Sequence, residues 1–294
     1  MDTTLGQVIK ASVTDENSQY FFAQVDGVTY EIDKSELEKP LKVGGFVTGF
    51  AYQNEGHRLQ ITKTIPAVQK DQYAWGTVVN ARHDLGVFVN IGLPNKDLVV
   101  SLDDLPTIKD LWPKTGDRLL LAIKEDNKGR LWGKLAQQDI IQAVSRQAKL
   151  GAGINKGDQV EATVYRNKLV GTLVLTADYQ LGFIHPSQRE QEPRLGEVVK
   201  ARVLGVNDRG IVNLSLKPLA YKLMDDDASF LLIQLQRKAD HFLPFNDKSD
   251  PEAIKAQFGF SKSQFKRALG RLYKERLITQ VDGGIQLTEA GQKD

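Results

Sequence analysis

Hydrophobic and polar residues alternate in short segments over most of residues 1–217, and glycines or polar clusters separate these segments. Alternation with a period of two is typical of β-strands that bury one face. The stretch WGTVVNARHDLGVFVNIG, residues 75–92, is the clearest example, because two alternating runs flank a polar turn. The pattern predicts a mainly β structure for this part of the chain.

The strand pattern recurs three times along the chain. A glycine turn, an alternating strand, a polar turn and a second strand ending in lysine occupy residues 43–63, 115–134 and 195–217. With the strands ahead of them, each unit has five short strands over about 65 residues, which favours closed barrels of the oligonucleotide-binding (OB) type. We therefore predict a multi-domain chain with barrels at residues 1–65, 66–140 and 153–218, and a helical linker at 141–152.

The hydrophobic period changes to about 3.6 after Pro218. Residues 219–240 contain neither glycine nor proline and predict one helix. Ser249, with a glutamate three residues later and a proline suited to the first turn, has the spacing of a helix cap. We expect this second helix to end at Gly259.

A third helix begins at Ser261, which forms a capping-box pattern with Gln264, and a hairpin turn follows at residues 282–284. These elements predict an α/β winged helix over residues 219–294, whose third helix and wing usually contact nucleic acid. The apolar positions of the third helix are Phe265, Ala268, Leu269 and Leu272, and its candidate nucleic-acid contacts are Lys262, Lys266, Arg267 and Arg271. Alternatively, this basic face only keeps the domain soluble or packs on the neighbouring barrel.

Composition narrows the classes of function. The chain has no cysteine, which excludes disulfides, thiolate metal sites and cysteine nucleophiles. No apolar run is long enough to span a membrane, and the first residues lack the sections of a signal peptide, so we expect a cytoplasmic protein. The net charge of +2 is uneven, because residues 1–65 carry six basic and nine acidic residues. Local basic faces are expected on the later domains.

No arrangement of residues indicates an enzyme. The four histidines, His57, His83, His185 and His241, fall in different units without the spacing typical of metal ligands or a general base. The run at residues 225–227 is a charged helix face rather than a nuclease cluster, because neighbours on a helix point in different directions. We expect no catalytic residue, no metal and no cofactor.

The phrases LGVFV and GFIHPS, each with its downstream strand pair, resemble the RNA-binding repeat of ribosomal protein S1. The resemblance covers residues 73–134 and 160–217. It implies a row of RNA-facing side chains, aromatic in that family, which falls here on Leu85, Phe88 and Val100 in the second unit and on Val170, Leu173 and His185 in the third. The first unit lacks both phrases and is net acidic, so we interpret it as a degenerate barrel used for packing or partner contacts.

Phe88 and His185 are the strongest candidates for stacking on unpaired bases. Phe88 alternates with Val87 and Val89 and so lies on the polar face of its strand. The alternatives are a contact of Phe88 with a neighbouring domain and a His185 ring that merely packs. Basic residues that could neutralise phosphates nearby, unless they are ordinary surface charges, are Arg82, Lys96, Arg166, Lys168 and Arg202.

The order of modules, with the phrases DLGVFV, GLPNK, LWPK, GFIHPS, NDKS and SKSQFKRALG, resembles the conserved virulence factor B family of bacteria. This resemblance implies a non-enzymatic RNA-binding regulator of gene expression. We expect single-stranded RNA to bind to the second and third barrels with help from the winged helix. Individually weak sites could still bind RNA together, because the modules are linked. Two other hypotheses stay open: a protein scaffold associated with the ribosome or polymerase, and a DNA-binding regulator led by the winged helix.

Overall fold

The computed structural model describes residues 4–217 and 226–292 of the chain. It divides into two compact units, residues 1–216 and 217–294, which are described separately below.

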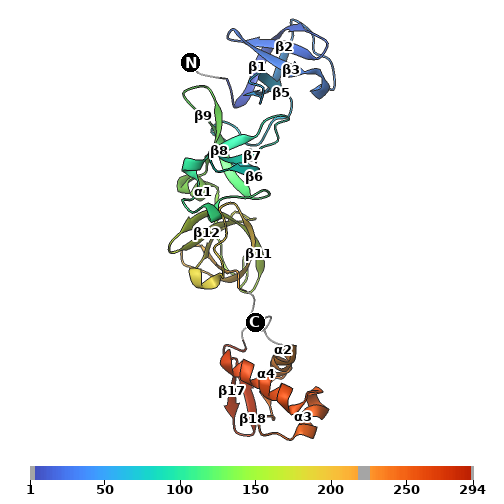
Figure 1. Ribbon diagram of the computed structural model, residues 1–294, viewed down its shortest axis with the longest axis vertical. Helices are drawn as coiled ribbons and strands as arrows, with labels where there is room; N and C mark the ends of the chain where they lie inside the picture. Colours follow the sequence, from blue (N-terminus) through green and yellow to red (C-terminus); the bar gives the residue numbers. More distant parts are fainter. Residues whose placement is uncertain (1–3, 218–225, 293–294) are drawn as a thin grey trace. The chain divides into compact units, whose positions relative to one another are not determined.

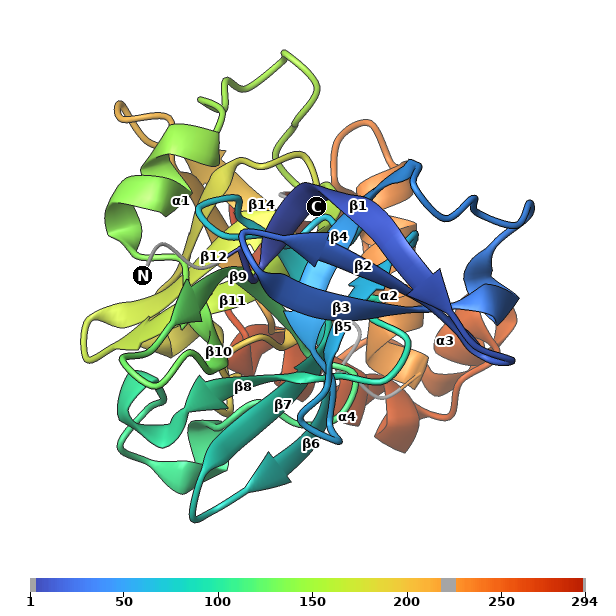
Figure 2. The ribbon, with the colours of Figure 1, turned by 90° about the horizontal axis from the view of Figure 1, so that it is seen from above.

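The first unit contains three closed barrels of five strands each, which confirms the predicted fold class (Figure 1). In every barrel the first three strands are consecutive neighbours, and the fifth lies between the third and the fourth. Figure 2 shows this order in the first barrel, where β2 lies between β1 and β3. The third and fifth strands pair in parallel and close each barrel, whereas the other pairs are antiparallel.

The strands of the first barrel are β1 (Gln7–Glu16), β2 (Tyr20–Val25), β3 (Val28–Asp33), β4 (Phe46–Gln53) and β5 (Leu59–Thr62). Those of the second are β6 (Ala74–Arg82), β7 (Gly86–Asn90), β8 (Leu98–Ser101), β9 (Arg118–Glu125) and β10 (Leu131–Leu135). Those of the third are β11 (Gln159–Lys168), β12 (Gly171–Thr176), β13 (Leu181–Ile184), β14 (Val198–Val206) and β15 (Val212–Ser215). Short 3₁₀ helices are η1 (Lys34–Glu36), η2 (Leu102–Asp104), η3 (Lys109–Leu111) and η4 (Pro186–Gln188).

The first strand of each barrel is irregular at the same place. The pairing register shifts between Val13 and Asp15 in β1, between Val78 and Asn80 in β6, and between Val164 and Arg166 in β11. Such bulges bend a strand and increase its twist, which allows a five-stranded sheet to close. The residue after each shift lies on the outer face of its barrel.

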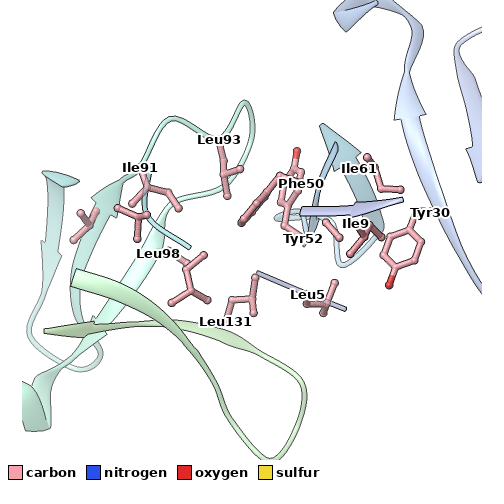
Figure 3. Packing of buried hydrophobic residues seen from close by; sticks show 14 of the residues in the cluster. Leu5, Ile9, Tyr30, Phe50, Tyr52, Ile61, Ile91, Leu93, Leu98 and Leu131 are labelled. Carbon is pink, nitrogen blue, oxygen red and sulfur yellow. The ribbon is translucent and has the colours of Figure 1, made fainter. Parts of the chain in front are cut away.

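The first and second barrels share one hydrophobic core cluster (Figure 3). Phe50 and Tyr52 of β4 are fully buried, and the loop at residues 91–97 of the second barrel contributes the buried Leu93 to the same cluster. The Tyr52 hydroxyl lies 2.8 Å from Asn95 Oδ1, and Asn95 Nδ2 donates to Gln60 Oε1 at 3.0 Å. Burial raises the pKa of the Tyr52 hydroxyl, with a further contribution from the Glu36 carboxylate, so it remains a hydrogen-bond donor.

The second and third barrels are joined by polar contacts. Arg118 N donates to Gly196 O at 2.8 Å, and Trp75 Nε1 donates to the Tyr179 hydroxyl at 3.1 Å. The Arg194 guanidinium also binds the Asp117 carboxylate, with an N–O distance of 3.2 Å and an Asp117 side chain that is 8% exposed. These bonds connect residues that are distant in sequence, so the second and third barrels are held in direct contact rather than joined only by the linker.

The helix between these barrels is shorter than the predicted linker. The structure has α1 at Gln138–Val144, and residues 145–152 are not helical, so the prediction of a helix over 141–152 is wrong for most of its length. Ile141 of α1 is buried in a small cluster with Leu120 and Ala136. Ile140 also packs against this cluster, and two residues after the helix ends the backbone of Arg146 donates to Tyr179 O at 2.7 Å.

The second unit has the order expected of a winged helix, which confirms this part of the prediction. Its elements are α2 (Asp226–Arg237), β16 (Phe242–Leu243), α3 (Pro251–Phe258), α4 (Lys262–Lys274), β17 (Ile278–Val281) and β18 (Gly284–Leu287), with the sheet order β16-β18-β17. Helix α4 buries the four predicted apolar residues and has the predicted capping box of Ser261 and Gln264. Residues 218–225, the start of the helix predicted over 219–240, lie outside the described residues, and α2 ends at Arg237.

The cap of α3 differs from the prediction by one residue. Asp250, not Ser249, is the N-cap, and its carboxylate accepts from the backbone N–H groups of Glu252 and Ala253. Ser249 Oγ instead accepts from the backbone of Asn246 at 2.9 Å and closes the preceding loop. A carboxylate is favoured over a hydroxyl here because it also interacts with the positive end of the helix dipole.

In the described part of the chain, no helix is both long and apolar enough to cross a membrane.

We expect Asp117→Asn to lower the free energy of unfolding of the first unit by about 2 kcal/mol, because a charged hydrogen-bond partner of a half-buried arginine is lost. All three tryptophans lie in this unit, so urea unfolding of the full chain followed by tryptophan fluorescence measures the change. The control is Asp84→Asn. This substitution breaks the exposed ion pair with Arg82 and should lower the free energy of unfolding by less than about 1 kcal/mol. Equal effects of the two substitutions would contradict a structural role for the Asp117–Arg194 pair.

Candidate nucleic-acid interface

One row of cross-strand neighbours runs across the outer face of the second barrel. Asn80 of β6 pairs with Phe88 of β7, and Phe88 pairs with Val99 of β8. Val99 pairs with Trp132 of β10, which pairs with Lys124 of β9. Side chains opposite each other in a ladder lie about 4.5–5.5 Å apart at Cβ, so Val99 separates two aromatic rings on a continuous surface.

Strand alternation positions both rings. Val87 and Val89 are fully buried on either side of Phe88, which is half-buried. Leu131 and Gly133 are buried on either side of Trp132, which is also half-buried. Phe88 therefore lies on the outer face, as the sequence pattern predicts. Trp132 was not among the predicted site residues, although the alternation in LWGK would have identified it.

The turn after β9 holds Trp132 in place. Trp132 Nε1 donates to Asp126 Oδ2 at 3.2 Å, and the Arg130 guanidinium lies over the indole at 5.5 Å from the ring centroid. The same carboxylate accepts from the backbone and guanidinium of Arg130 and from the backbone of Lys128. These bonds, with the Arg130 backbone N–H as the largest contribution, hold the pKa of Asp126 well below its usual range. The indole is thus fixed before any ligand arrives.

The third barrel has the same row with different side chains. Arg166 of β11 pairs with Leu173 of β12, Leu173 pairs with Phe183 of β13, and Phe183 pairs with Asn213 of β15. Phe183, which the sequence prediction also missed, is half-buried and lies edge-on to His185, with 6.4 Å between the ring centroids. This barrel therefore carries one phenylalanine and one histidine on its outer face.

His185 is exposed and has a structural role as well. It is the N-cap of η4, and its Nδ1 accepts from the backbone N–H of Ser187 at 3.2 Å. Its exposure excludes the alternative of a core histidine. This hydrogen bond holds the Nδ1 side of the imidazole ring. The rest of the ring stays at the surface, beside Phe183.

The residue equivalent to His185 in the second barrel is Ser101, so the prediction of Val100 is wrong by one position. Ser101 caps η2 as His185 caps η4, and it pairs with Gly86. Val100 points into the core and is fully buried. The error reverses the face, because successive residues of a strand point to opposite sides.

Glycine at the start of β12 makes room for Phe183. A Cβ on Gly171 would lie 2.5 Å from the Phe183 ring and 2.7 Å from Ile184 O, and the φ of Gly171 is +149°. Gly86 at the start of β7 is equally constrained, with a φ of +136° and a Cβ position 2.0 Å from Val100 O. The glycine of the LGVFV phrase is therefore required by a close backbone approach.

The first barrel uses the same row for packing. The equivalent positions are Phe22, Glu31, Gln60 and Tyr52 in cross-strand order. Glu31 forms an ion pair with Arg58 at 3.1 Å, whereas Tyr52 and Gln60 are buried beneath Asn95 of the second barrel. The Tyr52 end of this row is therefore occupied by the second barrel, whereas Phe22 and Glu31 are half-buried.

The predicted cations of the barrels differ in their surroundings. Arg82 is exposed and forms a two-bond pair with Asp84 (2.7 and 3.2 Å), whereas Lys96 is half-buried in the loop that packs on the first barrel. Arg166 donates to Gln137 Oε1 at 2.8 Å beside Leu173, and Lys168 is exposed at the end of the same strand. Arg202 pairs with Ser215 on β15. Arg166 and Lys168 thus adjoin the row of the third barrel.

The cations of α4 lie outside its buried stripe of Phe265, Ala268, Leu269 and Leu272. Lys266 is exposed and Lys262 is half-buried. Arg267 binds Asp227 at 3.2 Å, and Arg271 lies 3.8 Å from Glu275. Among the described residues, no group of three His, Asp or Glu side chains could hold a metal ion.

Three S1-like barrels followed by a winged helix define a class of multidomain protein built from nucleic-acid-binding modules. Family models match these modules one by one: an S1 domain at residues 5–64, the first S1-like domain of CvfB at 73–134, the second domain of the virulence regulatory factor CvfB at 141–218, and a CvfB-like winged helix domain at 230–287. The chain belongs to the conserved virulence factor B family.

Relatives match over nearly the whole chain. Conserved virulence factor B of Staphylococcus epidermidis is 35% identical over 278 residues, which cover 94% of this chain and 92% of that protein. The Staphylococcus aureus protein of the same name is 36% identical over 94% of this chain and 91% of its own. A crystal structure of a multidomain protein with nucleic acid binding domains from Streptococcus pneumoniae is 44% identical, with a TM-score of 0.70 and coverage of 98% and 99%.

Proposed function

We propose that this protein is a non-enzymatic regulator of gene expression that binds single-stranded RNA in the cytoplasm. The observation that carries the proposal is the row of Phe88, Val99, Trp132 and Lys124 across the second barrel. Two fixed aromatic rings beside a cation suit unpaired bases, because base stacking tolerates any sequence and the cation neutralises a phosphate. A duplex does not fit such a row, since its bases already stack on each other.

The third barrel and the winged helix add to this interface. Phe183 and His185 offer a second stacking surface, flanked by Arg166 and Lys168. Helix α4 offers Lys262 and Lys266, with Arg267 and Arg271 partly neutralised by acids of their own unit. Because the modules are linked, later contacts are intramolecular, and individually weak sites bind RNA together.

The regulatory part of the proposal is supported by the family to which the chain belongs, described as a virulence regulatory factor. Binding without catalysis points to control after transcription, through access of other proteins or of the ribosome to the bound RNA. The virulence role is carried over from the family and not from any residue of the site.

We expect Phe88→Ala and Trp132→Ala each to weaken binding of unstructured RNA by about 1–3 kcal/mol, the range for one lost base stack. Fluorescence anisotropy with labelled oligouridylate at low salt measures the change. The matched control is Phe46→Ala, which removes a ring that is 65% exposed on the first barrel, outside the row. If Phe46→Ala is as harmful as the other two, the row is not the binding surface.

The second barrel suggests the sharpest test of His185. His185→Ser copies Ser101, which caps η2 with a hydroxyl, so we expect the melting temperature to be kept and the affinity for RNA to fall. His185→Phe keeps a ring for stacking but removes the cap, so it should retain part of the affinity at lower stability. Unchanged affinity in both variants would mean that His185 does not contact RNA and that the third barrel binds RNA through its cations alone.

The winged helix is expected to contribute charge rather than base recognition. Changing Lys266, Arg267 and Arg271 together to glutamine should reduce the slope of log affinity against log salt by up to about 2, at about 0.7 per phosphate of single-stranded RNA. The control changes Lys238, Lys248 and Lys255, which are exposed on the same unit but outside α4. Equal slopes in the two triple variants would mean that α4 does not meet RNA. Tighter binding of duplex DNA in competition would favour a DNA-binding regulator instead.

A further inference from the structure

A second feature of the second barrel is an open groove of about 830 Å³ beside the aromatic row. It lies between the linker that precedes β6 and the hairpin of β9 and β10. Four lysines line it: Lys70, Lys124, Lys128 and Lys134. They come from the linker, from both strands and from the turn, so the fold gathers charges from separate segments.

Backbone bonds fix the linker side of the groove. Lys70 N donates to Gly6 O at 2.7 Å, and Ile123 N donates to Gln69 O at 3.0 Å, which attaches the linker to both the first barrel and β9. Lys124 and Lys134 are held by the ladder of β9 and β10. The walls are therefore in place without a ligand.

The charges of the groove favour an anion. Of its three carboxylates, Asp126 is already surrounded by N–H donors from Lys128, Arg130 and Trp132. Lys124 lies 3.2 Å from Asp104. Lys70, Lys128 and Lys134 form no ion pair with another residue of the described ranges. Asp71 and Glu125 are the other two carboxylates, so these three lysines outnumber the two carboxylates.

The groove continues the row of the candidate interface. Lys124 is the direct ladder neighbour of Trp132 and also lines the groove. We propose that the groove binds the phosphates of the same RNA strand whose bases stack on Phe88 and Trp132, which leads the strand from the second barrel toward the linker. This inference rests on the proposed function. It extends the footprint beyond the barrel face and assigns the path of the backbone to Lys70, Lys128 and Lys134.

The test compares RNA length and salt dependence in the full chain. Lys70, Lys128 and Lys134 are changed together to glutamine, and binding is measured with oligouridylates of about 4 and about 12 nucleotides, which span the site sizes of OB folds. We expect the triple variant to bind the short RNA as the wild type does but to lose the extra affinity of the long one. Its salt slope with the long RNA should fall by about 2.

A matched control changes Lys39, Lys42 and Lys156, which are exposed away from the groove. If both triple variants behave alike, the groove does not bind RNA, whereas the effects of Phe88→Ala and Trp132→Ala would still stand. If no RNA binds the wild type, the proposed function itself fails. Competition with tripolyphosphate tests whether the groove is instead a site for free phosphate. The proposal is overturned if tripolyphosphate, at equal charge, displaces the labelled long RNA as well as the same RNA without a label does.

Discussion

Closure of each barrel through the parallel pair of its third and fifth strands is the constraint on which the rest of the structure depends. The pair fixes the register of the ladder, and a register shift of one residue would turn every side chain to the opposite face. In the second barrel the pairs of Val99 with Trp132 and of Val100 with Gly133 bring β8 against β10. Without this closure, Phe88 of β7 and Trp132 of β10 would not share a surface.

The same row of positions has two uses in one chain. In the first barrel it contains Glu31, Gln60 and Tyr52, and the loop that carries Asn95 bonds to Gln60 and Tyr52. In the second it carries two aromatic rings and is half-exposed. Part of the surface of the first barrel is therefore used to hold the second barrel, through Asn95, and the linker, through the bond of Lys70 N to Gly6 O.

Alternation and turn residues made most of the fold predictable, including the three barrels, the capping box of α4 and the outward position of Phe88. The prediction failed where tertiary contacts decide. The alternation in LWGK places Trp132 on an outer face, but that this face adjoins Phe88 depends on the pairing of β10 with β8, which the local pattern does not show. The prediction of Val100 is wrong by one residue because the second barrel has a serine, Ser101, at the cap position that His185 occupies in the third. The linker helix ends at Val144, after Ile140 and Ile141 have packed on the cluster with Leu120 and Ala136, and the chain then bonds to Tyr179 through the backbone of Arg146.

The most direct test of the account is to crosslink RNA that contains 4-thiouridine to the full chain and to identify the attached peptides by mass spectrometry. The account predicts that the main crosslinks fall in β7 and β10, at Phe88 and Trp132, with further ones at Phe183 and His185. Crosslinks confined to the first barrel, or to the winged helix alone, would contradict it.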